Sequence, residues 1–115
     1  MKPYTIIVDR RPKVKARPRH NKKGQVFTPK TTLQEEDHVA EAWVTQGGKI
    51  TDQPVEVMLV YSPTQTVITV VPSPHNAKTL RGDLDNYVKL ALDGIQRAGI
   101  IVNDQQVVHI DATKV

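Results

Sequence analysis

Four charged residues have the types and spacing that phosphodiester hydrolysis requires. Asp83 and Asp85 stand at the start of a predicted helix, and Lys89 follows Asp85 by about one turn. Asp104 lies in a later turn and can approach the two other carboxylates if the segment that follows it runs beside the helix start. Carboxylates that close repel one another unless a divalent cation neutralises them, and hard oxygen ligands suit Mg²⁺. Such an ion can polarise a phosphate and generate hydroxide from bound water, while Lys89 contacts the phosphate or orients that water.

Each of these residues also has a purely structural interpretation. Asp83 is a plausible helix N-cap, and Asp85 and Lys89 have the spacing of a surface ion pair. Asp104 stands beside Asn103, and both residue types favour turns. The residues alone leave the catalytic and the structural interpretations open.

The helix that carries the first three residues has the clearest pattern in the chain. Its apolar residues recur at the spacing of one helical face, at Leu84, Tyr87, Val88, Ala91, Leu92 and Ile95. We expect it to begin after Asp83 and to end near Gly99. Asp85 and Lys89 then lie on its polar side.

The remaining elements predict an α+β domain. Strands are expected at Tyr4–Val8, Val55–Tyr61, Thr66–Val71 and Val107–Val115, with a turn at residues 62–65. A helix should follow Thr28-Pro29, begin with a Thr32/Glu35 capping box and stop at Gly47-Gly48. Its apolar side is expected to include Leu33, Val39, Ala40, Trp43 and Val44. The order β-α-β-β-α-β indicates a single domain over residues 1–115, with two main helices on a mixed, mainly antiparallel sheet.

The charge is unevenly distributed. Residues 1–30, here called the basic arm, carry ten Lys and Arg against one Asp, a net charge of +9. The remainder carries six Lys and Arg against eleven Asp and Glu, a net charge of −5. Pro12 and Pro18 prevent regular helix, so residues of about 10–30 are expected to form an extended basic loop. Such a segment attracts polyanions, although a solvated leader would have the same composition. The expected DNA contacts are Lys13, Lys15, Arg17, Arg19, Lys30 and Arg81.

The composition excludes several classes of protein. There is no cysteine, which rules out disulfides, thiolate metal sites and cysteine nucleophiles. No apolar run approaches the ~20 residues that span a bilayer, and the N-terminus lacks a signal-peptide pattern. We therefore expect a cytoplasmic protein that does not contact membranes.

These motifs together resemble the RusA-type Holliday junction resolvases. The resemblance rests on Asp83-Leu84-Asp85-Asn86, on Lys89 and Asp93, and on residues 103–108, Asn-Asp-Gln-Gln-Val-Val. Residues 12–19 and 27–30 resemble the N-terminal signature of the family. One departure is Asn103, because members often have an acidic residue there.

The resemblance implies a RusA-like fold and a homodimer that binds branched DNA. It implies an endodeoxyribonuclease that resolves four-way junctions by paired symmetric nicks and uses Mg²⁺, with Mn²⁺ as an alternative. Asp83, Asp85 and Asp104 would hold the metal, and Lys89 would be the essential basic residue. Two other classes stay open. A nuclease for other branched or flapped DNA would differ in substrate preference, and a non-catalytic DNA-binding module would show no Mg²⁺-dependent nicking.

Overall fold

The computed structural model describes residues 3–15, 19–75 and 80–115, and of Arg19 and His20 it describes the backbone alone. The chain divides after Ser73 into two units, and each unit is described by itself. Two main helices and a three-stranded antiparallel sheet give the predicted α+β class. The assignment of the whole chain to one domain stays a prediction. No helix in the described ranges is long and apolar enough to cross a membrane.

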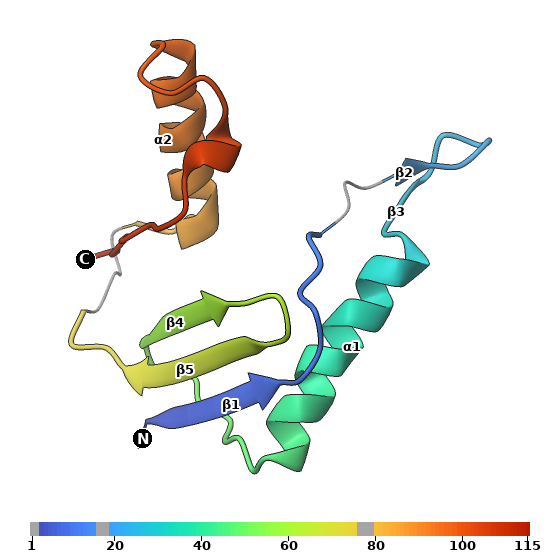
Figure 1. The fold of residues 1–115 in the computed structure, drawn as a ribbon, viewed down its shortest axis with the longest axis vertical. Coiled ribbons are helices and arrows are strands. Elements are labelled where there is room, and N and C mark those ends of the chain that lie inside the picture. Colours follow the sequence, from blue (N-terminus) through green and yellow to red (C-terminus); the bar gives the residue numbers. More distant parts are fainter. Residues whose placement is uncertain (1–2, 16–18, 76–79) are drawn as a thin grey trace. The chain divides into compact units, whose positions relative to one another are not determined.

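The first unit is built on an antiparallel sheet with the strand order β1-β5-β4 (Figure 1). Its strands are β1 (Tyr4–Val8), β4 (Val55–Tyr61) and β5 (Thr66–Pro72). The register places Ile68 of the central strand between Ile6 and Leu59. All three strands were predicted, and β5 is one residue longer than expected. The predicted turn between β4 and β5 is also confirmed, because the backbone N–H of Ser62 donates to the carbonyl of Gln65 at 2.9 Å.

The core of the first unit lies beneath β1 and β5. The buried hydrophobic side chains among the described residues are those of Ile6, Val8 and Val70. Ile6 and Val8 alternate with the exposed Thr5 and Ile7, as expected for a strand with one face toward a core. Every residue of β4 is exposed. The core of the first unit, as described, is therefore small.

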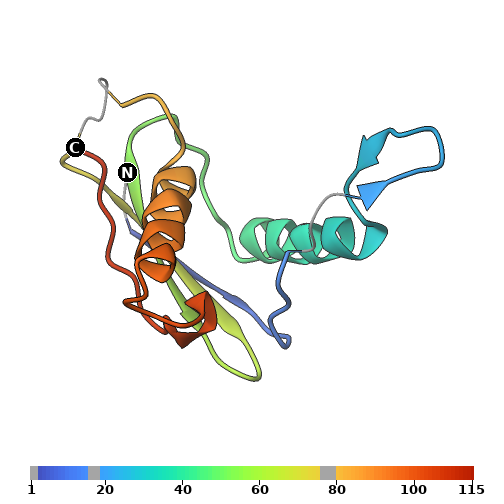
Figure 2. The ribbon, with the colours of Figure 1, turned by 90° about the horizontal axis from the view of Figure 1, so that it is seen from above.

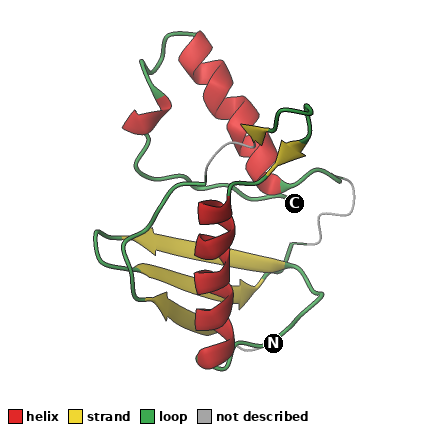
Figure 3. Cartoon of the chain, turned by 90° about the vertical axis from the view of Figure 1, so that its right-hand side faces the viewer, coloured by secondary structure: helices red, strands yellow, loops and turns green. Residues whose placement is uncertain are grey.

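The helix α1 (Lys30–Thr45) packs against β1 (Figure 3). Its end is joined to that strand by Gln46, whose side-chain oxygen accepts from the backbone N–H of Ile7 at 2.9 Å. The amide nitrogen of Gln46 donates to the carbonyl of Ile7 at 2.7 Å. Gln46 thus occupies backbone groups that an edge strand would otherwise leave unpaired. Nearby, the rings of Trp43 and Tyr4 lie 6.1 Å apart, and a Cβ at Gly48 would overlap the Trp43 indole.

The predicted start of α1 is wrong in its details. The helix begins at Lys30, directly after Pro29, and Pro29 makes no side-chain cap hydrogen bond. Thr32 therefore lies in the first turn, where it is buried, and Glu35 binds Arg10 instead of closing a capping box. Proline has a fixed φ and no N–H, so it favours an earlier helix start than the Thr32 pattern suggested. The predicted apolar side is also only partly covered, because the side chains of Leu33, Val39 and Val44 are exposed.

The basic arm contains a short hairpin that was not predicted. Its two strands are β2 (Arg19–His20) and β3 (Val26–Phe27), which pair antiparallel. The side-chain oxygen of Asn21 accepts from the backbone N–H groups of Lys23 and Gln25, both at 2.9 Å. Gly24 has a φ of +77°, which glycine adopts without strain. These local bonds make a turn where only an extended loop was expected.

The second unit consists of α2 (Leu84–Arg97), the short 3₁₀ helix η1 (Asp104–Gln106) and the segment that follows (Figure 2). The prediction for α2 is confirmed, with Asp83 as N-cap and Gly99 at φ +81° after its end. The predicted strand over residues 107–115 is wrong, because the structure has no strand there. A strand requires a pairing partner, and the second unit offers none in its described residues. The segment instead runs back along α2 toward the start of that helix (Figure 2).

Candidate active site

Asp83 is held by its backbone, while its carboxylate makes no hydrogen bond or ion pair with the described residues. Its extended φ and ψ of −66° and 139° place it at the N-cap, where its carbonyl accepts from the N–H groups of Asn86 and Tyr87 at 3.1 and 3.4 Å. Its side chain makes no cap hydrogen bond, although a capping carboxylate would normally do so. The capping interpretation therefore accounts for the position of Asp83 but not for its charge.

Gly82 fixes the backbone immediately before Asp83. Its N–H donates to the Tyr87 hydroxyl at 3.2 Å, and its carbonyl accepts from the Lys114 ammonium at 3.0 Å. A Cβ at this position would lie 2.9 Å from Cε2 of Tyr87, so any larger residue would displace that ring. These roles of Tyr87 and Lys114 were not predicted from the sequence. A glycine just before paired aspartates was the available signal.

Asp85 and Lys89 are both exposed, and neither takes part in an ion pair among the described residues. Asp85 lies in the first turn of α2, where the helix dipole favours negative charge by roughly 0.3–1 kcal/mol. The surface ion pair that would have explained both residues without catalysis is thus absent from the structure. Both side chains are available to a ligand.

Asp104 begins η1, but its neighbours make the turn. Asn103 accepts from the backbone N–H of Gln105 at 2.8 Å, and its own N–H donates to the side chain of Gln106 at 3.0 Å. This is a capping box, in which an aspartate at position 103 would serve equally well. The Asp104 carboxylate, which is exposed, makes no hydrogen bond or ion pair with the described residues. The turn-forming role belongs to Asn103, and the charge of Asp104 is again unexplained by the fold.

The three carboxylates belong to one unit, but the described structure does not bring them close enough together to hold a metal ion. The η1 helix packs beside α2, and Gln96 near the end of α2 donates to the carbonyl of Val102 at 3.4 Å. Within the described ranges, no three His, Cys, Asp or Glu residues are close enough to hold a metal ion together. The donor chemistry fits a hard divalent cation, since all three side chains offer unengaged carboxylate oxygens. The chain therefore offers three candidate metal ligands, and their assignment to a metal site stays a prediction.

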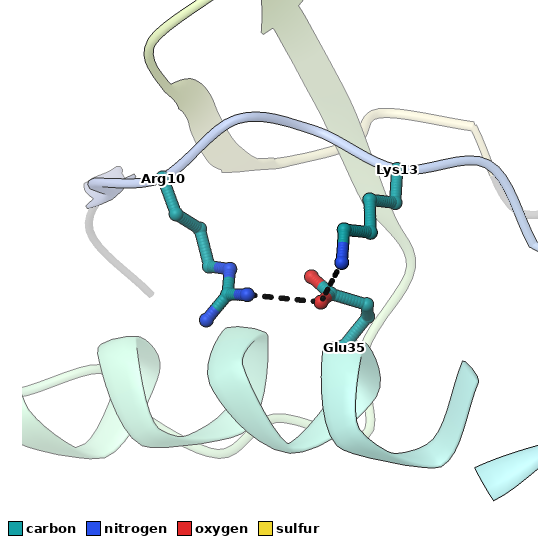
Figure 4. Close-up of polar contacts among 3 residues, drawn as sticks. All are labelled: Arg10, Lys13 and Glu35. Carbon is teal, nitrogen blue, oxygen red and sulfur yellow. Dashed lines mark hydrogen bonds and ion pairs between the residues drawn. The ribbon is translucent and has the colours of Figure 1, made fainter. Parts of the chain in front are cut away.

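Some of the expected DNA contacts form ion pairs within the fold, and others do not. Lys13 lies 3.5 Å from Glu35, which also binds Arg10 (Figure 4), and Lys15 lies 3.5 Å from Glu36. These pairs were not predicted, although the acidic run at residues 35–37 was a signal. Lys30 and Arg81 are exposed and have no ion pair within the described part of the chain. Arg17 lies outside the described residues, as does the side chain of Arg19.

Comparison with known families gives one result. The family model described as endodeoxyribonuclease RusA matches residues 9–115, nearly the whole chain. The match spans both units, including the basic arm from Asp9 onward and all four candidate catalytic residues. No curated protein and no solved structure matches the chain.

Proposed function

The chain belongs to the RusA endodeoxyribonuclease family and is therefore a Holliday junction endonuclease, for which we propose a Mg²⁺-dependent mechanism that uses Asp83, Asp85, Lys89 and Asp104. Enzymes of this family depend on a divalent metal ion. Mg²⁺ is the ion that we propose, and Mn²⁺ is an alternative with the same preference for oxygen ligands.

One observation carries the proposal. Three exposed carboxylates, two at the start of α2 and one at the start of η1, make no hydrogen bond or ion pair with the described residues. Asp83 holds the N-cap position and Asp85 gains from the helix dipole, but no hydrogen bond or ion pair within the described residues uses any of the three carboxylates. Unengaged carboxylates in a nuclease are best explained as metal ligands, with DNA phosphate oxygens and water completing the coordination.

The four candidate catalytic residues would have different roles. Asp83, Asp85 and Asp104 would hold the ion, which polarises the scissile phosphate and activates water when bound. Lys89 would place its ammonium against the same phosphate and stabilise the charge that grows in the transition state. The backbone around Gly82, bonded to Tyr87 and Lys114, keeps Asp83 in position.

The basic arm would supply most of the DNA affinity. The proposed phosphate contacts are Lys13, Lys15, Arg17, Arg19 and Lys30 within the arm, and Arg81 outside it. Lys13 and Lys15 are 60% and 73% exposed at their side chains, so their ion pairs with α1 are open to exchange. Phosphates compete well for such cations, because binding releases the counterions condensed on DNA.

A homodimer would supply the two cuts that resolve a junction. One chain contains one set of the candidate residues, and a two-fold pair places two equal sets in symmetric positions. The exposed apolar side chains of β4, such as Val57 and Leu59, are apolar surface that a dimer interface could bury. We propose that the enzyme acts in the cytoplasm.

The deciding experiment compares substrates with and without the metal. The purified protein is offered a synthetic four-way junction, a flap, a fork and a linear duplex, each in Mg²⁺ or in EDTA. Paired, symmetric nicks in the four-way junction, in Mg²⁺ only, are expected. Preference for the flap or fork would favour the broader branched-DNA nuclease, and nicking in EDTA would refute the metal-dependent mechanism.

A further inference from the structure

Arg11 differs from the other described cations near the start of the basic arm. Arg10, Lys13 and Lys15 all pair with Glu35 or Glu36 of α1. Arg11 is exposed and has no ion pair with any described residue. Its guanidinium donors are therefore available to a ligand.

Arg11 lines a shallow pocket that is largely open to solvent. It has a volume of about 290 Å³ and is lined by Arg11, Pro12, Tyr61, Ser62 and Pro63. All of these residues belong to the first unit, and they join the basic arm to the turn between β4 and β5. The volume is slightly below the ~300–1,000 Å³ of typical small-molecule sites, which suits a single nucleotide.

The pocket is lined by a hydrogen-bonded turn, by two prolines and by one aromatic side chain. The Ser62 hydroxyl donates to the carbonyl of Gln65 and accepts from its N–H, both at 3.2 Å, which fixes the turn. The two prolines have restricted backbones and lose little freedom when a ligand binds. Tyr61 ends β4, lines the pocket and is 63% exposed, so solvent reaches most of its side chain.

Proteins commonly bind an unstacked nucleotide with an aromatic side chain for the base and an arginine guanidinium for the phosphate. Aromatic rings stack on any nucleobase, with a gain of about 1–3 kcal/mol for each base. A guanidinium binds phosphate through paired hydrogen bonds. The net charge of +9 on the basic arm favours a nucleic acid over other ligands that contain a flat ring.

We propose that this pocket is a subsite for one unstacked nucleotide of the DNA, with its base against the Tyr61 ring and its phosphate on the Arg11 guanidinium. The subsite rests on the proposed function, because branched DNA offers nucleotides that have left the stack. It lies apart in the chain from the candidate catalytic residues, so binding can be measured without cleavage.

The test uses the full chain in EDTA and a ten-nucleotide oligothymidine as the probe. Tyr61→Thr removes the ring and keeps a side chain suited to a strand, and it should weaken binding about 5- to 100-fold. Tyr61→Phe keeps the ring and should bind like the parent. Arg11→Gln should flatten the slope of log K against log salt by about 0.7, as expected for one phosphate contact in single-stranded DNA.

Two matched controls exclude general effects. Val60→Ala alters the neighbouring strand residue, which is 62% exposed, and Lys49→Gln removes an exposed cation that lies outside the basic arm. Both should bind as the parent does, and all variants should melt at the parent's temperature. A four-way junction with 2-aminopurine at the crossover provides a second readout. Its fluorescence should be quenched by the parent and by Tyr61→Phe, and not by Tyr61→Thr.

Clear results overturn the subsite. It is refuted if the parent does not bind the oligothymidine, if Tyr61→Thr binds as the parent does, or if Tyr61→Phe loses as much affinity as Tyr61→Thr. Nicking of the four-way junction in Mg²⁺ is measured in parallel. A parent that cuts junctions while Tyr61 variants bind normally refutes the subsite alone. A parent that binds through Tyr61 but cuts nothing refutes the proposed mechanism alone.

Discussion

Arg10 donates a hydrogen bond of 3.0 Å to Glu35, and this bond ties the beginning of the basic arm to α1. The pair is partly buried, with side-chain exposures of 36% for Arg10 and 24% for Glu35. The Lys15–Glu36 pair further along the arm is much more exposed, at 73% and 55%. The basic arm is thus fixed to α1 by a partly buried ion pair at Arg10, whereas its pair at Lys15 is exposed to solvent.

The two glutamates should therefore respond differently to neutralisation. Glu35→Gln leaves the half-buried Arg10 without its charged partner, and we expect a loss of about 1–2 kcal/mol in the free energy of unfolding. Glu36→Gln should leave stability nearly unchanged and raise junction affinity by up to about fivefold at low salt, because it frees Lys15 for phosphate. Glu41→Gln, an exposed position on the same helix, is the control. Equal affinities for the Glu36 and Glu41 variants would contradict the exchange of Lys15 from α1 to DNA.

Neutralising a candidate metal ligand should separate cleavage from binding. Asp85→Asn and Asp104→Asn should each abolish nicking while junction binding persists or tightens, because an unoccupied carboxylate only repels phosphate. Neither carboxylate makes a hydrogen bond or ion pair with the described residues, so the melting temperature should change little, apart from the small helix-dipole contribution of Asp85. Gel shifts, nicking assays and thermal melting on the same preparations check this. Asp37→Asn, an exposed aspartate on α1, should cut normally. Near-normal cleavage by both site variants would remove the metal assignment.

Lys89 should affect the rate of cutting and little else. Loss of one preorganised contact to the transition state costs about 10²–10³ in rate, so Lys89→Ala should slow single-turnover nicking at least ~10²-fold at saturating Mg²⁺. Stability should be preserved, because no ion pair with Asp85 exists to be lost. Lys89→Arg should also be slow, since a broad guanidinium does not replace a compact ammonium. If Lys89→Ala nicks within a few-fold of the parent, Lys89 is not catalytic.

The close approach of Gly82 to Tyr87 gives a further prediction. Gly82→Ala places a methyl group 2.9 Å from the Tyr87 ring, so the ring must move and its hydrogen bond to the Gly82 N–H weakens. We expect slower nicking, because the backbone that precedes Asp83 shifts. Gly94→Ala is the matched control within α2, where an added Cβ meets nothing within 4 Å. That change should raise stability by about 0.5–1 kcal/mol through helix propensity and leave nicking unchanged. Single-turnover rates and thermal melting check both variants. Equal nicking rates for the two variants would show that Gly82 does not position Asp83.

The elements that were predicted correctly are those governed by local patterns. The apolar spacing from Leu84 to Ile95 determined α2, and alternating or β-branched runs determined β1, β4 and β5. Asp83, Asp85, Lys89 and Asp104 were likewise identified from residue type and spacing alone. The family match covers the segment that contains them, and their individual roles stay a prediction.

Tertiary structure decided what depends on partners distant in the sequence. Residues 107–115 have the composition of a strand, but strand formation requires a neighbouring strand, and Lys114 bonds the Gly82 carbonyl instead. Glu35 has the spacing of a capping-box residue, yet Arg10, which lies 25 residues earlier, binds it in the folded chain. Whether a charged side chain is used by the fold or left for a ligand depends on which groups reach it in space. Local spacing alone does not contain that information, which is why the unengaged state of Asp83, Asp85 and Asp104 became visible only in the structure.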